Sequence, residues 1–217
     1  MNYSSYTAKL VSVALTLVGF GLGAEVNAQT TYQFEPTTYD SAITTTLLQQ
    51  NPTGIILDTN VTGQSGNAPY GLTNLTIKNY SSVDPATGVV TYNSDPATFG
   101  LQNLPLGTVS LFGSGDDKLF GTNRGTVSPG SGSGTITITG GEGRFSGATG
   151  SLNLFQTITS NPDPTGLTAP IISPATISGS FQTPQTVPEP KTDATLVCVS
   201  VLGASFLLSQ RRRRVAV

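Results

Sequence analysis

The amino-acid sequence predicts an all-β protein, an antiparallel β-barrel of about eight strands with a β-sandwich as the alternative. An N-terminal signal helix and a C-terminal apolar helix are expected to flank the strands. Two observations support this fold class. The chain between its two ends is rich in Gly, Thr, Ser and Asn, which lowers helix propensity almost throughout, and short runs of β-branched and aromatic residues are separated there by turn formers. We favour a barrel because closing the sheet removes the exposed edge strands that promote aggregation.

The expected strands follow one another along the chain with turns between them. They are residues 32–35, 54–58, 74–80, 88–92, 108–112, 118–127, 134–139, 150–159 and 175–183. In residues 134–139, Ile136 and Ile138 share one face and threonines occupy the other. The same period of two recurs in residues 150–159 and 175–183. Each of these strands is therefore expected to bury one face and to expose the other.

Three segments fall outside this pattern. In residues 40–50 (DSAITTTLLQQ), Asp40 could cap a short helix with Ile43 and Leu47 on one side, whereas three consecutive threonines disfavour a helix. Residues 95–107 and 160–174 are rich in Pro, Asn and Asp, and we expect both to form long surface loops.

The composition excludes several kinds of functional site. None of the 217 residues is histidine, which excludes His-ligated zinc, a Ser-His-Asp triad and a His general base. The only cysteine, Cys198, lies near the C-terminus, so residues 29–186 contain neither a disulfide nor a thiol nucleophile. These residues carry four basic and nine acidic side chains, a net charge of −5, which disfavours binding to nucleic acid. Tryptophan is absent, so the side chains left for stacking on sugars are Tyr32, Tyr39, Tyr70, Tyr80 and Tyr92.

The N-terminal segment has the pattern of a secretory signal peptide. Lys9 precedes an apolar run over residues 10–24, and Val26-Asn27-Ala28 supplies the small residues that signal peptidase requires. A buried first helix is disfavoured because the run has no polar face. The pattern predicts a signal peptide over residues 1–28, cut between Ala28 and Gln29, and a β-domain over residues 29–186.

The C-terminal segment combines three features in a fixed order. The residues Val187, Pro188, Glu189 and Pro190 (VPEP) are followed by a short polar spacer and an apolar run over residues 194–209. As a helix this run would be about 24 Å long, shorter than the span of ~20 residues that usually crosses a bilayer. Four arginines, Arg211, Arg212, Arg213 and Arg214, come next and would stay on the cytoplasmic side.

This order of VPEP, apolar helix and arginine cluster resembles the PEP-CTERM sorting signal. The resemblance implies that residues 187–217 are a removable label, processed near Pro188–Pro190 by an exosortase-type membrane transpeptidase. It also implies a Gram-negative host that makes extracellular polysaccharide. The protein would be held transiently in the inner membrane by its C-terminal transmembrane helix and then reach the cell surface or the extracellular matrix. The alternative is a permanent membrane anchor.

The segment GSGDDKLFG, residues 113–121, fits the calcium-binding nonapeptide repeat of parallel β-rolls. In that architecture neighbouring turns surround each ion together, so a single copy does not complete a site. The sequence contains no second copy, which favours a hairpin turn. Asp116 and Asp117 remain the candidate calcium ligands, and the prediction includes no required metal and no cofactor.

The segment GGEGRFSGATGSL, residues 140–152, is expected to form a hairpin in which Phe145 points into the core. Together with the upstream DDKLFGT, it resembles the closing strands of allene oxide cyclase and dirigent-type barrels over residues 116–156. The resemblance implies an eight-stranded antiparallel barrel with an apolar lumen. In the cyclases a carboxylate in the lumen acts on a small lipid epoxide, and Glu35 is the candidate here. Its strand position is equally compatible with exposure to solvent.

The sequence therefore favours an exported cell-surface or extracellular-matrix domain that is non-catalytic, with extracellular polysaccharide as its candidate partner. A small apolar-ligand barrel with isomerase activity like that of the cyclases is the alternative. Calcium-dependent adhesion through Asp116 and Asp117 is a weaker alternative.

Overall fold

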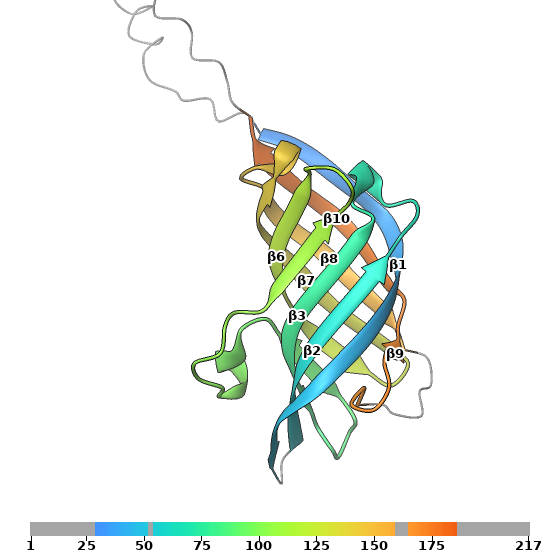
Figure 1. Cartoon of the computed structure of the whole chain (residues 1–217), viewed down its shortest axis with the longest axis vertical. Coiled ribbons are helices and arrows are strands. Elements are labelled where there is room, and N and C mark those ends of the chain that lie inside the picture. Colours follow the sequence, from blue (N-terminus) through green and yellow to red (C-terminus); the bar gives the residue numbers. More distant parts are fainter. Residues whose placement is uncertain (1–28, 52–53, 159–164, 186–217) are drawn as a thin grey trace, which may run out of the picture. The chain divides into compact units, whose positions relative to one another are not determined.

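The structure, a computed structural model, describes residues 29–51, 54–158 and 165–185 (Figure 1). It is all-β, and every pairing between its strands is antiparallel. The strands are β1 (Gln29–Asn51), β2 (Gly54–Gln64), β3 (Asn74–Val83), β4 (Val90–Asn93), β5 (Thr108–Phe112), β6 (Lys118–Ser128), β7 (Ser131–Glu142), β8 (Thr149–Thr157), β9 (Ile171–Ile172) and β10 (Ala175–Pro184). The described connections contain the short 3₁₀ helices η1 (Pro69–Gly71), η2 (Pro96–Phe99) and η3 (Gly143–Phe145).

The strands form a single sheet that closes on itself. The order runs β1-β2-β3-β4-β6-β7-β8-β10, and β10 pairs with β1, which makes a ring of eight strands. Strands β4 and β5 lie end to end in one position of the ring, because each pairs with a different part of both β3 and β6. We call this arrangement the strand ring. It differs from a sandwich, which has two packed sheets.

Strand β1 is much longer than the sequence predicted. It pairs with β10 through its first part and with β2 from Asp40 onward. The short helix considered for residues 40–50 is therefore wrong, in agreement with the β-branched threonines of this segment. The pairing register shifts between Phe34 and Thr37 and again between Leu47 and Gln49. Such bulges bend a strand and let one long strand follow the curved sheet.

The other expected strands are confirmed, with differences of a few residues at their ends. Only the two-residue strand β9 had not been expected, and it lies within the expected loop 160–174. The segment 113–121 forms the β5–β6 hairpin, with Leu111 opposite Leu119. The segment 140–152 forms the β7–β8 hairpin, and Phe145 between the two strands is fully buried.

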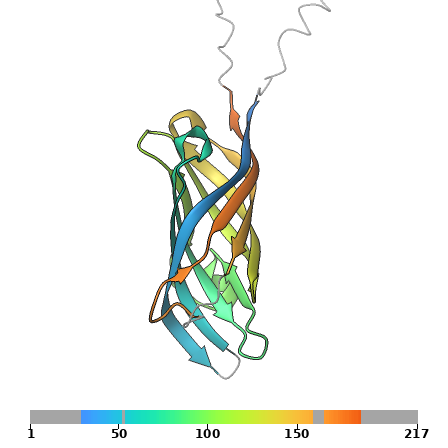
Figure 2. The ribbon, with the colours of Figure 1, turned by 90° about the vertical axis from the view of Figure 1, so that its right-hand side faces the viewer.

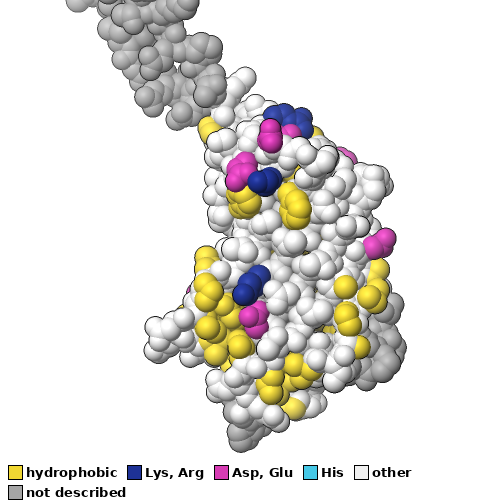
Figure 3. Space-filling view, viewed as in Figure 1, with side chains coloured by type: hydrophobic (Ala, Val, Ile, Leu, Met, Phe, Trp, Pro, Cys, Tyr) yellow, Lys and Arg dark blue, Asp and Glu magenta, His cyan; other side chains and the backbone are white. Residues whose placement is uncertain are grey.

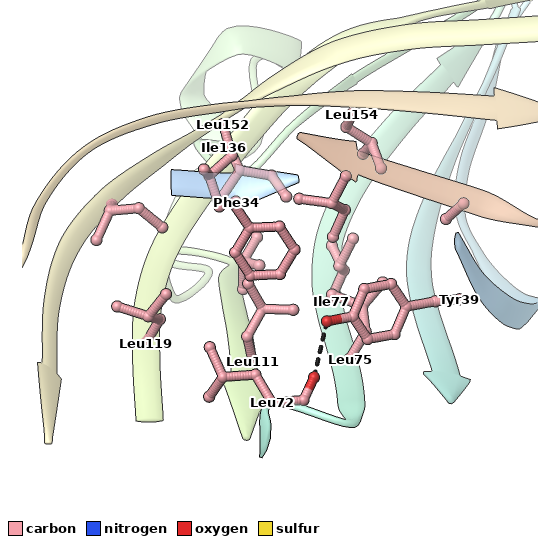
Figure 4. Packing of buried hydrophobic residues seen from close by; sticks show 14 of the residues in the cluster. Phe34, Tyr39, Leu72, Leu75, Ile77, Leu111, Leu119, Ile136, Leu152 and Leu154 are labelled. Carbon is pink, nitrogen blue, oxygen red and sulfur yellow. Dashed lines mark hydrogen bonds between the residues drawn. The ribbon is translucent and has the colours of Figure 1, made fainter. Parts of the chain in front are cut away.

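One end of the strand ring is filled by side chains. Inward-facing residues of the alternating pattern, such as Ile136, Leu152 and Phe34, pack together there (Figure 4). The hydroxyl of Tyr39 donates a hydrogen bond of 2.7 Å to the carbonyl of Leu72 within this packing. Four aromatic rings close the same end, with centroids 5.1 to 6.2 Å apart: Tyr32, Tyr70, Phe145 and Phe181.

Different segments of the chain lie at the two ends of the strand ring. Gln29 lies opposite Pro184, so the first and last strands start and finish side by side at the aromatic end (Figure 2). The β3–β4 turn after Val83 lies at the other end. The predicted signal peptide (1–28) and the predicted sorting segment (187–217) lie outside the described residues. Within those residues, the structure contains no helix that is long and apolar enough to cross a membrane.

Candidate functional site

The interior of the strand ring contains a cavity of about 100 Å³ at the end opposite the aromatic cluster. Its walls are partly apolar, with side chains from four strands of the sheet: Ile77, Val127, Leu154 and Ile171. Hydroxyl groups of Thr45, Thr59, Ser81 and Thr165 belong to residues that line it, and its four larger polar side chains come from β3, β4, β6 and β8: Asn79, Tyr92, Asn123 and Gln156. All four are buried, with exposed fractions between 3 and 5%. We call this space the ring cavity.

The polar residues occupy inward positions because they continue the alternation of apolar residues along each strand. On β3 the inward series is Leu75, Ile77 and Asn79. On β8 the series Leu152 and Leu154 ends at Gln156 in the same way. A polar side chain at the end of such a series must enter the interior, since successive residues of a strand face opposite sides. Asn79, Asn123 and Gln156 were not among the predicted site residues, and Tyr92 was considered only for stacking on sugars, although this pattern was visible in the sequence.

A chain of hydrogen bonds fixes the amide groups of the ring cavity. Asn79 donates from Nδ2 to Oδ1 of Asn123 at 3.2 Å. The hydroxyl of Ser94 donates to the same Oδ1 at 3.0 Å and accepts from the backbone N–H of Asn123 at 2.9 Å. Oδ1 of Asn123 therefore has two donors. By contrast, Oδ1 of Asn79 is buried without a hydrogen-bond partner.

Tyr92 is the largest polar side chain of the ring cavity. Its hydroxyl lies against the backbone of Gly125 and Gly134, where an added Cβ would be 2.4 and 2.0 Å from the hydroxyl oxygen. This oxygen is buried and has no hydrogen-bond partner. Burial raises the pKa of Tyr92 to about 12, so the group keeps its proton near neutral pH and can donate it in a hydrogen bond.

Glu35, the sequence-predicted catalytic candidate, does not face the cavity. Its neighbour Phe34 is buried in the ring interior, whereas Glu35 is exposed. Adjacent residues of a strand point to opposite sides, so the carboxylate lies on the outer surface. This position does not favour the role of Glu35 as a carboxylate of the lumen.

The calcium candidates Asp116 and Asp117 lie in the β5–β6 turn, and Asp117 is engaged by Arg144. Its Oδ1 accepts from the backbone N–H of Arg144 and its Oδ2 from Nε, both at 2.7 Å. These bonds lower the pKa of Asp117. Asp116 is exposed. Within residues 29–51, 54–158 and 165–185, no group of three or more His, Cys, Asp or Glu side chains could hold a metal ion.

The tyrosines considered for sugar stacking are taken up by the packing of the protein, and Tyr80, on the outer side of β3, donates its hydroxyl to the carbonyl of Pro105 at 2.7 Å. Tyr39, Tyr80 and Tyr92 are at most 5% exposed, and Tyr32 and Tyr70 belong to the aromatic cluster. On the face in Figure 3 most of the surface is neither hydrophobic nor charged, and basic side chains lie beside acidic ones. Three ion pairs among the described residues account for such neighbours: Lys78–Asp58, Lys118–Glu142 and Arg144–Asp117. The outer surface is thus polar and carries little unpaired positive charge.

The sorting residues Val187 to Pro190 and Arg211 to Arg214, and the cleavage residue Ala28, lie outside the described residues, whereas Gln29 is the first residue of β1. No protein-family model matches the chain, and neither a curated protein nor a solved structure shows a significant match.

Proposed function

We propose that this protein is an exported, non-catalytic β-domain of the cell surface or extracellular matrix, delivered by its PEP-CTERM-type tail. The observation that carries the proposal is the order of VPEP at residues 187–190, the apolar run and the four arginines at 211–214. In the proposal, signal peptidase and an exosortase-type transpeptidase process the two ends, and extracellular polysaccharide is the candidate partner of the released domain.

We propose that the strand ring is a closed β-barrel, and a closed barrel suits this role. Each strand of the ring has neighbours on both sides, so the domain offers few free edges for uncontrolled pairing outside the cell. Gln29 and Pro184 lie opposite each other, so both processed segments connect to the same end of the ring. The other end, which contains the ring cavity, is left free of these connections.

Intact mass spectrometry of protein recovered from producing cells and their medium tests this proposal. We expect a species that starts at Gln29 and ends near Pro188–Pro190. Any mass added at the new C-terminus would identify the molecule to which the protein is joined. A species that still carries Arg211 to Arg214 would contradict the proposal and indicate a permanent membrane anchor.

A pair of tail variants makes this test specific for the motif. Replacing Val187 to Pro190 with four alanines is expected to abolish the shortened species. The matched control replaces the spacer residues Lys191, Thr192 and Asp193 with alanine and is expected to be processed normally. Equal processing of both variants would show that VPEP is not the recognised element.

Two other functions from the sequence are less favoured. The cyclase-like isomerase needs a carboxylate inside the ring, and Glu35 is exposed. Calcium-dependent adhesion needs free carboxylates, and both oxygens of Asp117 accept hydrogen bonds from Arg144. Calorimetry with millimolar calcium tests the second function, and we expect no binding heat.

A further inference from the structure

We infer that the ring cavity is a binding site for one small neutral molecule, of about the size of phenol, that combines a hydroxyl group with an apolar body. This inference goes beyond the proposed function and does not depend on where the protein is sorted. It rests on two buried polar atoms without partners, on the absence of charge around them, and on the volume enclosed.

The two unpartnered atoms belong to side chains that line the same cavity. The hydroxyl of Tyr92 and Oδ1 of Asn79 have no hydrogen-bond partner, and their side chains are 5% and 3% exposed. A buried donor or acceptor that is left unsatisfied destabilises the folded protein. Native proteins rarely keep such groups without a partner in an interior. An occupant of the cavity that bonds to either atom reduces this destabilisation.

The hydrogen-bond network dictates which polar group suits these atoms. Nδ2 of Asn79 already donates to Asn123, so Oδ1 of Asn79 is the atom left as an acceptor. The hydroxyl of Tyr92 is protonated and donates. A hydroxyl on the ligand both donates and accepts, so it suits either atom: it can donate to Oδ1 of Asn79 or accept from the hydroxyl of Tyr92. A carboxylate has no proton to offer Asn79 and would meet its carbonyl oxygen unfavourably.

The walls of the cavity favour a neutral molecule with an apolar part. No Asp, Glu, Lys or Arg is among the described residues that line it. An ion buried there would lack a charged partner, and its loss of hydration would oppose binding. Ile77, Val127, Leu154 and Ile171 provide apolar contacts for a ring or a short hydrocarbon chain.

The volume limits the size of the ligand. The ring cavity measures about 100 Å³, whereas an engineered cavity of about 150 Å³ holds benzene and drug-sized pockets measure about 300–1,000 Å³. Phenol is larger than benzene, so it marks the upper limit of ligand size, and its ring has to extend toward the open end of the cavity. Val83 and Val90, at the β3–β4 turn, are only partly buried, so the cavity reaches the end of the ring where a ligand can enter.

The test uses the purified full chain with isotope-labelled methyl groups and three probes of similar shape: phenol, toluene and benzoate. We expect phenol to shift the methyl resonances of Ile77, Leu154 and Ile171. The methyl groups of Leu72 and Leu111, at the packed end of the ring, are expected to stay unchanged. Toluene lacks the hydroxyl and should bind about tenfold more weakly, the effect of losing roughly one buried hydrogen bond. Benzoate should not bind.

Two matched variants connect the effect to the proposed contact. Tyr92→Phe removes only the hydroxyl and is expected to weaken phenol binding about tenfold while leaving toluene binding unchanged. Tyr39→Phe removes a buried tyrosine hydroxyl outside the cavity and is expected to leave phenol binding unchanged.

Three results would overturn the inference. Absence of phenol-induced shifts at the cavity methyl groups would mean that the cavity holds ordered water only. Equal affinities of phenol and toluene in the unmodified chain would mean that the polar atoms select nothing. Tight binding of benzoate would show that the site accepts an anion. None of these comparisons requires a variant to fold.

Discussion

Removal of a single hydroxyl from Tyr39 or from Tyr92 should have different effects on stability. Both side chains are buried, and both lie inside the strand ring. The hydroxyl of Tyr39 donates to the carbonyl of Leu72 at 2.7 Å, whereas the hydroxyl of Tyr92 has no hydrogen-bond partner. The substitutions Tyr39→Phe and Tyr92→Phe remove the same atom from two different environments.

The expected magnitudes follow from these environments. Tyr39→Phe removes a buried hydrogen bond and leaves the carbonyl of Leu72 without it, which should lower the free energy of unfolding by about 1–3 kcal/mol. Tyr92→Phe removes a buried hydroxyl that gains nothing from the protein. Its effect should lie between roughly 1 kcal/mol of stabilisation and 0.5 kcal/mol of destabilisation.

Urea denaturation followed by far-UV circular dichroism measures both effects, and tyrosine fluorescence provides a second signal because the chain has no tryptophan. The slope of the free energy against urea should be the same for all three proteins, so that the midpoints can be compared directly. A loss of stability in Tyr92→Phe as large as that in Tyr39→Phe would refute the reasoning. It would mean that the Tyr92 hydroxyl is hydrogen-bonded in the folded protein.

Three further predictions use the same denaturation assay. Burial raises the folded-state pKa of Tyr92 from 10.0 to about 12 and also raises the pKa of Tyr39. The stability that depends on the two protonated hydroxyls is therefore fully present below pH 10, and the free energy of unfolding should fall above pH 10 by about 1.4 kcal/mol per pH unit for each tyrosine. Tyr92→Phe should make this fall shallower, and an unchanged slope would contradict the prediction. Gly134→Ala places a Cβ 2.0 Å from the Tyr92 hydroxyl and 2.5 Å from the Arg124 carbonyl, so it should lower the free energy of unfolding by about 1–3 kcal/mol. The control Gly140→Ala adds a Cβ with no atom within 4 Å and should lower it much less. Phe145→Ala should cost about 3–5 kcal/mol as the loss of a fully buried ring, and the half-exposed Phe155 should lose under about 1 kcal/mol on the same change; similar losses at both positions would contradict the burial assigned to them.

Most strands could be predicted from the sequence because their signals are local. In residues 134–139, for example, the alternation of Ile136 and Ile138 with threonine is visible within six residues. The length of β1 could not be predicted in the same way. Pro36 and Asp40 interrupt its pattern, and the strand persists because β10 and β2 supply its partners. Pairing between Gln29 and Pro184 joins the two ends of the domain and has no local signal at all.

The candidate site was not predicted from the sequence because its amide side chains carry no charge, and of its residues only Tyr92 had been considered, for stacking on sugars. Carboxylates such as Glu35, Asp116 and Asp117 were considered, and each lies on the surface or in a turn. The polar residues of the ring cavity are uncharged, and their type suggests no chemistry when they are taken singly. Their position is informative, since Asn79 and Gln156 each end an inward apolar series. A search for polar residues that continue such a series would have identified both.

The division of the ring into a packed end and a hollow end follows from which residues face inward. The interior of an eight-stranded ring is just wide enough for side chains to fill it. At the packed end the inward positions carry large residues such as Phe34 and Phe181. At the hollow end Gly132 and Gly134 of β7 contribute no side chain, and Val127 and the hydroxyl of Tyr92 occupy the space beside them. The cavity lies where the inward positions carry smaller or polar side chains, such as Thr59, Asn79 and Ser81, and these polar walls give the space a chemical preference that a packing defect would not need.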